Sequence, residues 1–150
     1  MATMSDLKKF EQVFRKMNIF DQTMGLDFEI EAPGQIIYQL EVQRKHLSSP
    51  QIAHGGVIAA MMDASLGLTA LSFSVVDEML VSTVEFKLNF LRPAREGDIL
   101  TGRGHIDYRG KSLIVCNSNI SNQEGHDIAK GIGTFNLYPM DKKDFSMFNA

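Results

Sequence analysis

One long apolar segment with a single charge in it limits what this chain can fold into. Residues 54–76, HGGVIAAMMDASLGLTALSFSVV, carry Asp63 as their one charged side chain. A helix that is apolar on most sides is normally buried by the rest of its chain, and an unpaired buried charge costs several kcal/mol. Asp63 is therefore expected to face a partner, solvent or a chemical site rather than an apolar core.

The same segment opens with His54-Gly55-Gly56, whose backbone N–H groups at a helix start are free to bind a ligand. Each feature alone has an ordinary explanation: glycine that helps packing, and an Asp that reaches solvent. Together they indicate an acyl-transfer or hydrolysis site. Asp63 lies eight positions after Gly55, which is roughly 12 Å along a helix. One carbonyl cannot touch both groups of one helix, so a shared site requires two copies of the chain across a two-fold interface.

Length and composition are those of one soluble globular domain. The chain has 150 residues, of which 44% are hydrophobic and 22% charged. A net charge of −3 disfavours nucleic-acid binding. The lone Cys116 excludes an internal disulfide and indicates a reduced, cytoplasmic setting, and the N-terminus lacks the apolar core of a signal peptide. Residues 54–76 are long enough to span a bilayer, but Asp63, the glycines and the missing basic flank argue against a membrane.

Hydrophobic periodicity divides the chain into a helix, two strands, a long helix and four strands. Residues 5–20 are expected to form an amphipathic helix capped by Ser5, and 46–53 a polar linker. The run 83–90 alternates apolar with polar residues, which predicts a polar face that carries Thr83 away from the helix. Its buried face would consist of Val84, Phe86, Leu88 and Phe90. The expected strands cover 25–30, 36–42, 83–90, 99–108, 113–121 and 128–138.

This order favours an α+β architecture in which an antiparallel sheet of about six strands wraps one long central helix, with an N-terminal helix added. His54-Gly55-Gly56, Asp63, the corner NFLRPA at 89–94, Gly97-Asp98 and the Gly110-Lys111 hairpin follow one another in the chain. They closely resemble the hotdog-fold acyl-CoA thioesterases of the phenylacetate-degradation (PaaI-like) type, in the 4-hydroxybenzoyl-CoA thioesterase superfamily. The resemblance implies an N-terminal helix at 1–24, a hotdog thioesterase domain at 25–138 and a tail at 139–150.

The resemblance implies hydrolysis of a thioester to a carboxylate and free CoA by a homodimer or a dimer of dimers, without a metal or other cofactor. It assigns the N–H of Gly55 to the thioester carbonyl oxygen. Asp63 of the facing subunit would be a general base or a nucleophile, and the residues do not choose between these roles. His54 would orient the loop, hydrogen-bond near the thioester sulfur, or only hold the turn. Thr83 stands where some relatives have a Ser that positions water.

One position departs from the pattern of the family. Its members commonly have an Asn six residues before the His, where this chain has Ser48. Serine is shorter and offers one donor in place of the two of an amide. Either Gln51 from the same loop substitutes for the Asn, or this chain lacks the role that the Asn has in the family.

Coenzyme A carries phosphates, which cations can bind. Six basic residues stand against three acidic ones between Lys87 and Lys111, although solvated strand edges would explain that excess equally well. The resemblance implies that the turn Arg109-Gly110-Lys111-Ser112 holds the nucleotide end, with the glycine allowing close backbone approach. The histidines lack the spacing of zinc ligands. The alternatives to a thioesterase are a non-catalytic acyl-CoA-binding module and a hotdog hydratase or dehydratase.

Overall fold

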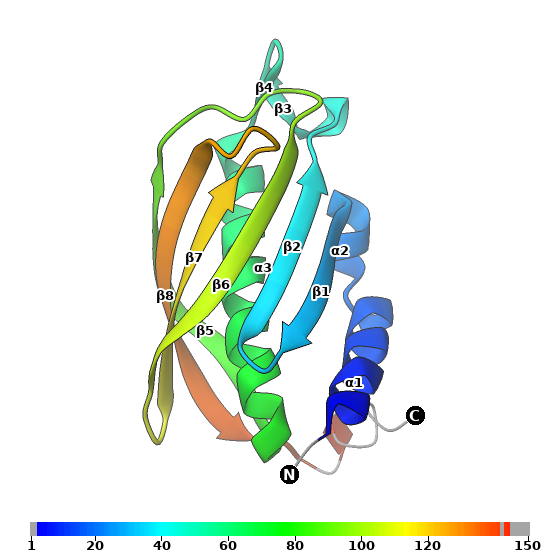
Figure 1. The fold of residues 1–150 in the computed structure, drawn as a ribbon, viewed down its shortest axis with the longest axis vertical. Coiled ribbons are helices and arrows are strands. Elements are labelled where there is room, and N and C mark those ends of the chain that lie inside the picture. The colour runs from blue at the N-terminus through cyan, green and yellow to red at the C-terminus, as the bar shows by residue number, and fades with distance from the viewer. Residues whose placement is uncertain (1–2, 142, 145–150) are drawn as a thin grey trace.

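Across the residues that the structure describes, 3–141 and 143–144, six antiparallel strands form one sheet that curls around a central helix (Figure 1). The structure is a computed structural model. The strands lie in the order β1-β2-β6-β7-β8-β5. They are β1 (Leu26–Ala32), β2 (Gln35–Glu41), β5 (Met79–Phe90), β6 (Ile99–Arg109), β7 (Leu113–Ser121) and β8 (Asp127–Pro139). The predicted hotdog fold is confirmed, and every expected strand is present. Most of the expected tail 139–150 lies outside the described residues.

The central helix α3 (Gly55–Ser74) packs one face closely against the concave side of the sheet. Strand glycines make this approach possible, because a Cβ on Gly104 would overlap the Thr69 hydroxyl, and one on Gly131 would lie 2.6 Å from Met62 Sδ. The segment Gly55–Asp77 is long and apolar enough to cross a membrane, but more than half of its apolar part is buried inside the protein. Its apolar character is therefore that of a core helix.

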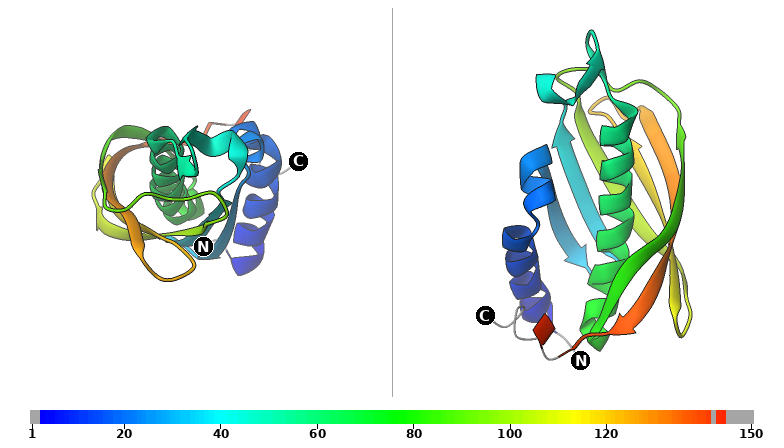
Figure 2. Two further views of the ribbon diagram at one scale, coloured as in Figure 1. Left: turned by 90° about the horizontal axis from the view of Figure 1, so that it is seen from above. Right: turned by 180° about the vertical axis from the view of Figure 1, so that it is seen from behind.

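The opposite face of α3 is not covered by the sheet (Figure 2). Its half-buried residues recur at three- and four-residue steps, which is one helical stripe: Ala59, Ala60, Asp63, Ala64 and Gly67. Asp63 therefore lies on an open face lined with small side chains, not in the apolar core.

The N-terminal region forms two helices, α1 (Met4–Met17) and α2 (Ile19–Met24), in place of the single predicted helix capped by Ser5. The N-cap is Thr3, because its hydroxyl accepts the N–H of Asp6 at 3.2 Å while the Asp6 carboxylate accepts the N–H of Thr3 at 2.8 Å. Asn18 leaves the helical conformation and its side chain caps α2 by accepting the N–H of Asp21 at 3.1 Å. The break turns α2 relative to α1, as Figure 2 shows.

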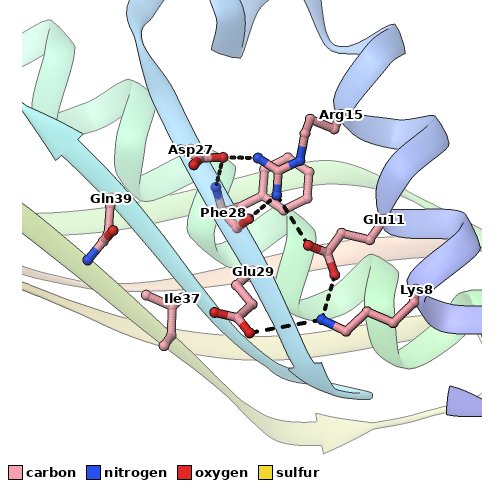
Figure 3. A pocket seen from close by; sticks show the side chains of 8 residues that line it. All are labelled: Lys8, Glu11, Arg15, Asp27, Phe28, Glu29, Ile37 and Gln39. Carbon is pink, nitrogen blue, oxygen red and sulfur yellow. Dashed lines mark hydrogen bonds and ion pairs between the residues drawn. The ribbon is translucent and has the colours of Figure 1, made fainter.

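A network of charged side chains docks α1 on β1 around a polar hollow of about 320 Å³ (Figure 3). The Arg15 guanidinium lies 4.4 Å from the centre of the Phe28 ring and hydrogen-bonds the Asp27 carboxylate. Lys8 donates to the Glu11 carboxylate at 3.1 Å. Both cations in the hollow are thus paired with acids, and the hollow serves as a docking contact between helix and sheet.

The linker 46–53 is not the simple connection that its polarity predicts, but folds into a small hairpin at the end of the sheet where α3 begins (Figure 1). The 3₁₀ turn η1 (Arg44–His46) leads into the hairpin, which consists of the strands β3 (Leu47–Ser49) and β4 (Ile52–Ala53). The turn between the strands places Gln51 at φ 66°, which is the position that follows Pro in a type II turn.

Candidate active site

The N-terminus of α3 presents a backbone N–H group with no hydrogen-bond partner among the described residues. His54 is the N-cap: its ring Nδ1 accepts the N–H of Gly56 at 2.7 Å, and its carbonyl accepts the N–H of Val57 at 3.0 Å. Within the described residues the N–H of Gly55 makes no hydrogen bond. Since a helix N-terminus also carries partial positive charge, this N–H is suited to bind a carbonyl oxygen or an oxyanion.

The residues beside Gly55 hold this N–H in place. Because Nδ1 of His54 accepts a hydrogen bond, the neutral ring carries its proton on Nε2. A Cβ on Gly56 would lie 2.8 Å from that Nδ1, so this position requires glycine. A Cβ on Gly55 would instead meet the Phe90 ring at 3.4 Å, an ordinary contact. His54 thus fixes the first turn of α3 through its side chain.

A buried histidine, to which the sequence assigned no role beyond lacking the spacing of a zinc ligand, anchors the segment before α3. His46 is 2% exposed. Its Nδ1 accepts the N–H of Gln43 at 2.9 Å, its Nε2 lies 2.7 Å from the carbonyl of Met24, and its carbonyl accepts the N–H of His54 at 2.8 Å. Among the described residues no cluster of three His, Cys, Asp or Glu side chains could hold a metal ion. His46 therefore ties the start of α3 to the end of α2.

Among the described residues the carboxylate of Asp63 has one hydrogen-bond partner, and it comes from β5. The hydroxyl of Thr83 donates to Asp63 Oδ1 at 3.0 Å. In the part of the chain that the structure describes, Oδ2 of Asp63 accepts no hydrogen bond. The pair presents a half-buried carboxylate with one oxygen held and the other free.

The predicted orientation of Thr83 is wrong, and a β-bulge is the reason. Thr83 pairs with Phe135 in β8, but Glu85 pairs with the adjacent Thr134, so Val84 is an extra residue. The side chains of Thr83 and Phe86, three positions apart, consequently both face α3, whereas regular alternation would place them on opposite faces. Two residues of the expected buried face are instead more than half exposed: Val84 and Phe90.

A cavity of about 470 Å³ lies beside Asp63, between α2, the open face of α3 and β5. Small side chains on α3 make room for it, and two aromatic rings, from α2 and β5, flank it. Its lining consists of Asn18, Phe20, Asp21, Gly56, Ala59, Ala60, Asp63, Ala64 and Phe86. The contribution of α2 does not follow from the sequence, because the periodicity of 5–20 indicates only an amphipathic helix.

The cavity contains a second carboxylate, Asp21, which is 4% exposed. Its Oδ2 accepts the hydroxyl of Tyr38 at 2.6 Å. Burial raises the pKa of the Asp21 carboxyl, and the hydrogen bond from Tyr38 opposes that shift. Burial and the nearby carboxylate also raise the pKa of Tyr38 above its ordinary value. The pair therefore joins α2 to β2 through a buried hydrogen bond.

The loop residues predicted to replace the family Asn lie in the exposed hairpin before α3. Ser48 belongs to β3, and Gln51 stands in the turn, where its carbonyl accepts the N–H of Glu96 at 3.0 Å. Among the described residues neither side chain makes a hydrogen bond to His54 or Asp63. The choice between Ser48 and Gln51 stays a prediction.

The basic turn lies at the opposite end of the molecule from Gly55. The segment Arg109-Gly110-Lys111-Ser112 connects β6 to β7, and Gly110 closes it by donating to the carbonyl of Leu113 at 2.8 Å. Arg109 lies 3.9 Å from the carboxylate of Asp77, which is three residues beyond the C-terminal end of α3. Because α3 has 20 residues, roughly 30 Å of helix separates the turn from Gly55, and one protomer does not bring them together.

The model of the thioesterase superfamily matches residues 51–129, which run from the hairpin before α3 into β8. This is more than half of the chain, and the chain belongs to that superfamily. The fold, the free N–H at the start of α3 and the carboxylate on its open face agree with this assignment. The protein is a thioester hydrolase of the hotdog fold.

One curated relative supports this activity, and two solved structures support the fold. Human acyl-coenzyme A thioesterase 13 is 26% identical over 138 residues, which cover 91% of this chain and 91% of that protein. The PaaI protein from the phenylacetic acid degradation operon of Escherichia coli has a TM-score of 0.84 at 19% identity, covering 93% and 98% of the two chains. A hypothetical thioesterase from Streptococcus pneumoniae, solved with coenzyme A, has a TM-score of 0.76 at 21% identity, covering 86% and 99%.

Proposed function

We propose that this thioester hydrolase acts on acyl-CoA esters at a site shared by the two subunits of a homodimer. The N–H of Gly55 in one protomer holds the thioester carbonyl oxygen, and Asp63 of the partner subunit acts on the carbonyl carbon. The products are a carboxylate and free CoA. The observation that carries this proposal is one helix with a free N–H at its start and a carboxylate on its open face, eight positions further on.

The Gly55 N–H supports the proposal because it is a free donor at a helix start, which suits the oxygen on which charge would develop. Attack on a thioester carbonyl puts negative charge on its oxygen, and a preorganised donor stabilises that oxyanion more than the ground-state carbonyl. Losing one such donor costs about 2.7–4 kcal/mol in characterised hydrolases. The N-cap bond from Gly56 to His54 leaves Gly55 as the donor available to the substrate.

Asp63 supports the proposal through its free oxygen. With Oδ1 held by Thr83, Oδ2 can remove a proton from water or attack the carbonyl carbon. Both roles need an ionised carboxylate with one unoccupied oxygen beside a cavity. Thr83 fixes the rotation of the carboxylate in either role, so we propose it as a positioning residue.

The edge of the sheet supports a dimer. Strand β5 has 12 residues and pairs with β8 along one side only. Its outer surface carries the exposed side chains of Val84 and Phe90, 58% and 59% accessible. An open edge of this length readily pairs with a second strand. Pairing of two β5 strands about a two-fold axis would bring the open faces of two α3 helices together and cover the cavity.

An antiparallel pair of α3 helices also gives the basic turn a role. Suppose that Asp63 of the partner subunit lies beside Gly55 of the first protomer. The partner's Asp77 follows its Asp63 by 14 positions, which places it roughly 21 Å beyond the start of the first protomer's α3. The partner's Arg109 and Lys111 would then stand beyond the thioester in the direction from which a long pantetheine arm enters. We propose that this turn holds the nucleotide end of CoA and belongs to the same protomer as the acting Asp63.

The names of the relatives support coenzyme A as the carrier: the human relative is an acyl-coenzyme A thioesterase, and the Streptococcus structure holds coenzyme A. A cytoplasmic setting and a dimer of dimers stay predictions.

Cys116 is buried, and burial raises its pKa to about 12, so this thiol is not a competing nucleophile.

Thiol release from a panel of acyl-CoA esters tests the proposal. We expect turnover by the wild-type chain and a loss of at least a hundredfold in Asp63→Asn, which keeps the size of the side chain but not its charge. Asp107→Asn, on the outer face of β6, is the matched control and should retain turnover. Turnover of Asp63→Asn within tenfold of wild type would contradict the role of Asp63. Binding without thiol release would favour the acyl-CoA-binding module, and hydration of an enoyl-CoA the hydratase.

A further inference from the structure

The proposed thioester hydrolysis assigns no role to Asp21. A carboxylate buried to 4% exposure is costly unless its oxygens are occupied. Tyr38 occupies Oδ2, but within the described residues Oδ1 accepts no hydrogen bond. Asp21 lines the cavity that also contains Asp63. Its unoccupied acceptor is therefore available to whatever fills that cavity.

The cavity has apolar walls and a polar end. Phe20 and Phe86 flank it, and the alanines of α3 form its floor. Asn18 and Asp21 supply polar groups from α2, and none of the described residues that line the cavity is a cation. A ligand in this space meets hydrocarbon along its length and a hydrogen-bond acceptor at Asp21.

The proposed reaction places the acyl group in this cavity. When Asp63 acts on the carbonyl carbon, the acyl group begins beside Asp63, and the adjoining space is this cavity, which is open to solvent in a single protomer. Its volume of about 470 Å³ is roughly three times that of a cavity of about 150 Å³ that holds one benzene molecule. An acyl group of medium length fits and can reach α2.

We propose that Asp21 is a specificity-determining residue that accepts a hydrogen bond from a hydroxyl group on the distal part of the acyl group. Hydroxyl-bearing acyl groups are then favoured over unsubstituted ones, which cover Oδ1 of Asp21 without giving it a hydrogen bond. Acyl groups that end in a carboxylate are disfavoured, since they add a third anion to a cavity with two carboxylates and no cation. This inference rests on the proposed function, because it needs the acyl group beside Asp63.

Three esters of equal chain length test the inference: hexanoyl-CoA, 6-hydroxyhexanoyl-CoA and adipyl-CoA. The measurement is kcat/KM from thiol release. Wild type should prefer the hydroxy ester over the unsubstituted ester by about tenfold or more, the size expected of one hydrogen bond to a charged acceptor. In Asp21→Asn that ratio should fall several-fold, while adipyl-CoA should gain relative to hexanoyl-CoA. Asp107→Asn removes a carboxylate far from the cavity and should leave both ratios unchanged.

The outcomes separate the inference from the proposed function. Equal kcat/KM for the hydroxy and unsubstituted esters in wild type, or equal ratios in wild type and Asp21→Asn, would overturn the role of Asp21. Asp63-dependent hydrolysis of hexanoyl-CoA would still support the proposed function in that case. If none of the three esters released thiol, both would fail. If Asp21→Asn did not fold, the order of the three esters in wild type would decide.

Discussion

Replacing Thr83 by Val keeps the shape of the side chain and removes the hydroxyl that donates to Asp63 Oδ1 at 3.0 Å. A hydrogen bond to a charged group contributes about 1.5–3 kcal/mol. Because Thr83 is exposed and Asp63 is half-buried, the lower end of this range applies, about 1.5 kcal/mol. Roughly 1.4 kcal/mol corresponds to a factor of ten, so we expect kcat to fall about tenfold. KM should change little, since Thr83 positions Asp63 rather than the bound ester.

Thiol release at saturating acyl-CoA gives kcat, and two further variants make the result specific. Thr83→Ser keeps a hydroxyl and should stay within about twofold of wild type. Ser82→Ala removes a hydroxyl from the exposed neighbour, which makes no hydrogen bond to Asp63, and should also leave kcat unchanged. A Thr83→Val enzyme with wild-type kcat would refute the reasoning, because the carboxylate would then need no positioning by β5.

Three further perturbations test the assembly, the nucleotide site and the buried carboxylate. Equal mixing of inactive Asp63→Asn and Gly55→Val chains should restore about a quarter of wild-type activity, because half of the dimers are mixed and each has one intact site; activity no higher than that of the separate variants would contradict a shared site. Replacing Arg109 and Lys111 together by Ala should raise KM for acyl-CoA several-fold at low salt with unchanged kcat, and should not affect a pantetheine thioester. Burial raises the pKa of Asp21 from its ordinary 3.8, so the stabilisation that protonated Asp21 gives the folded state is complete below pH 3.8 and is lost as pH rises. In thermal melts the melting temperature of Asp21→Asn should therefore rise relative to that of wild type between pH 4 and pH 7. A difference in melting temperature that does not depend on pH would contradict this.

Hydrophobic periodicity predicts the helices and strands because the pattern of each element lies in consecutive residues. The apolar run 54–76 forms α3, and the alternating runs form the strands of the sheet. The one charge in the long helix correctly indicates that part of its surface is open. Asp63 belongs to a stripe of small residues at helical spacing, and the composition and spacing of that stripe are visible in the amino-acid sequence itself.

The face of Thr83 could not be predicted, because a bulge changes the alternation without leaving a mark in composition. Val84 is an ordinary strand residue, and neither Gly nor Pro stands beside it. The break between α1 and α2 has a visible signal in Asn18, a residue that favours capping positions over helix interiors. The apolar periodicity of 5–20 outweighs that signal when the sequence is interpreted alone.

The residue pattern alone indicated the candidate site only where it lies on one helix, and Thr83 entered through the family resemblance with the wrong orientation. Gly55 at the N-terminus of α3 and Asp63 lie eight positions apart in one apolar segment, so both can be recognised in the sequence. The role of Asp21 depends on Tyr38, 17 positions away, and on a cavity formed by three elements. The turn at Arg109 illustrates the same limit. Its charges are evident in the sequence, but its distance from Gly55 depends on the order and direction of the strands in the sheet.

The two faces of α3 differ in their freedom to change over evolutionary time. On the sheet side, Gly104 has no room for even one methyl group beside Thr69, so a substitution there would shift the helix and the whole fold with it. On the other side, Ala59 and Ala60 border open space, and larger residues there would shorten the cavity without disturbing the sheet. With the acyl group in this cavity, as proposed, single substitutions there would change the acyl preference while the scaffold stays intact.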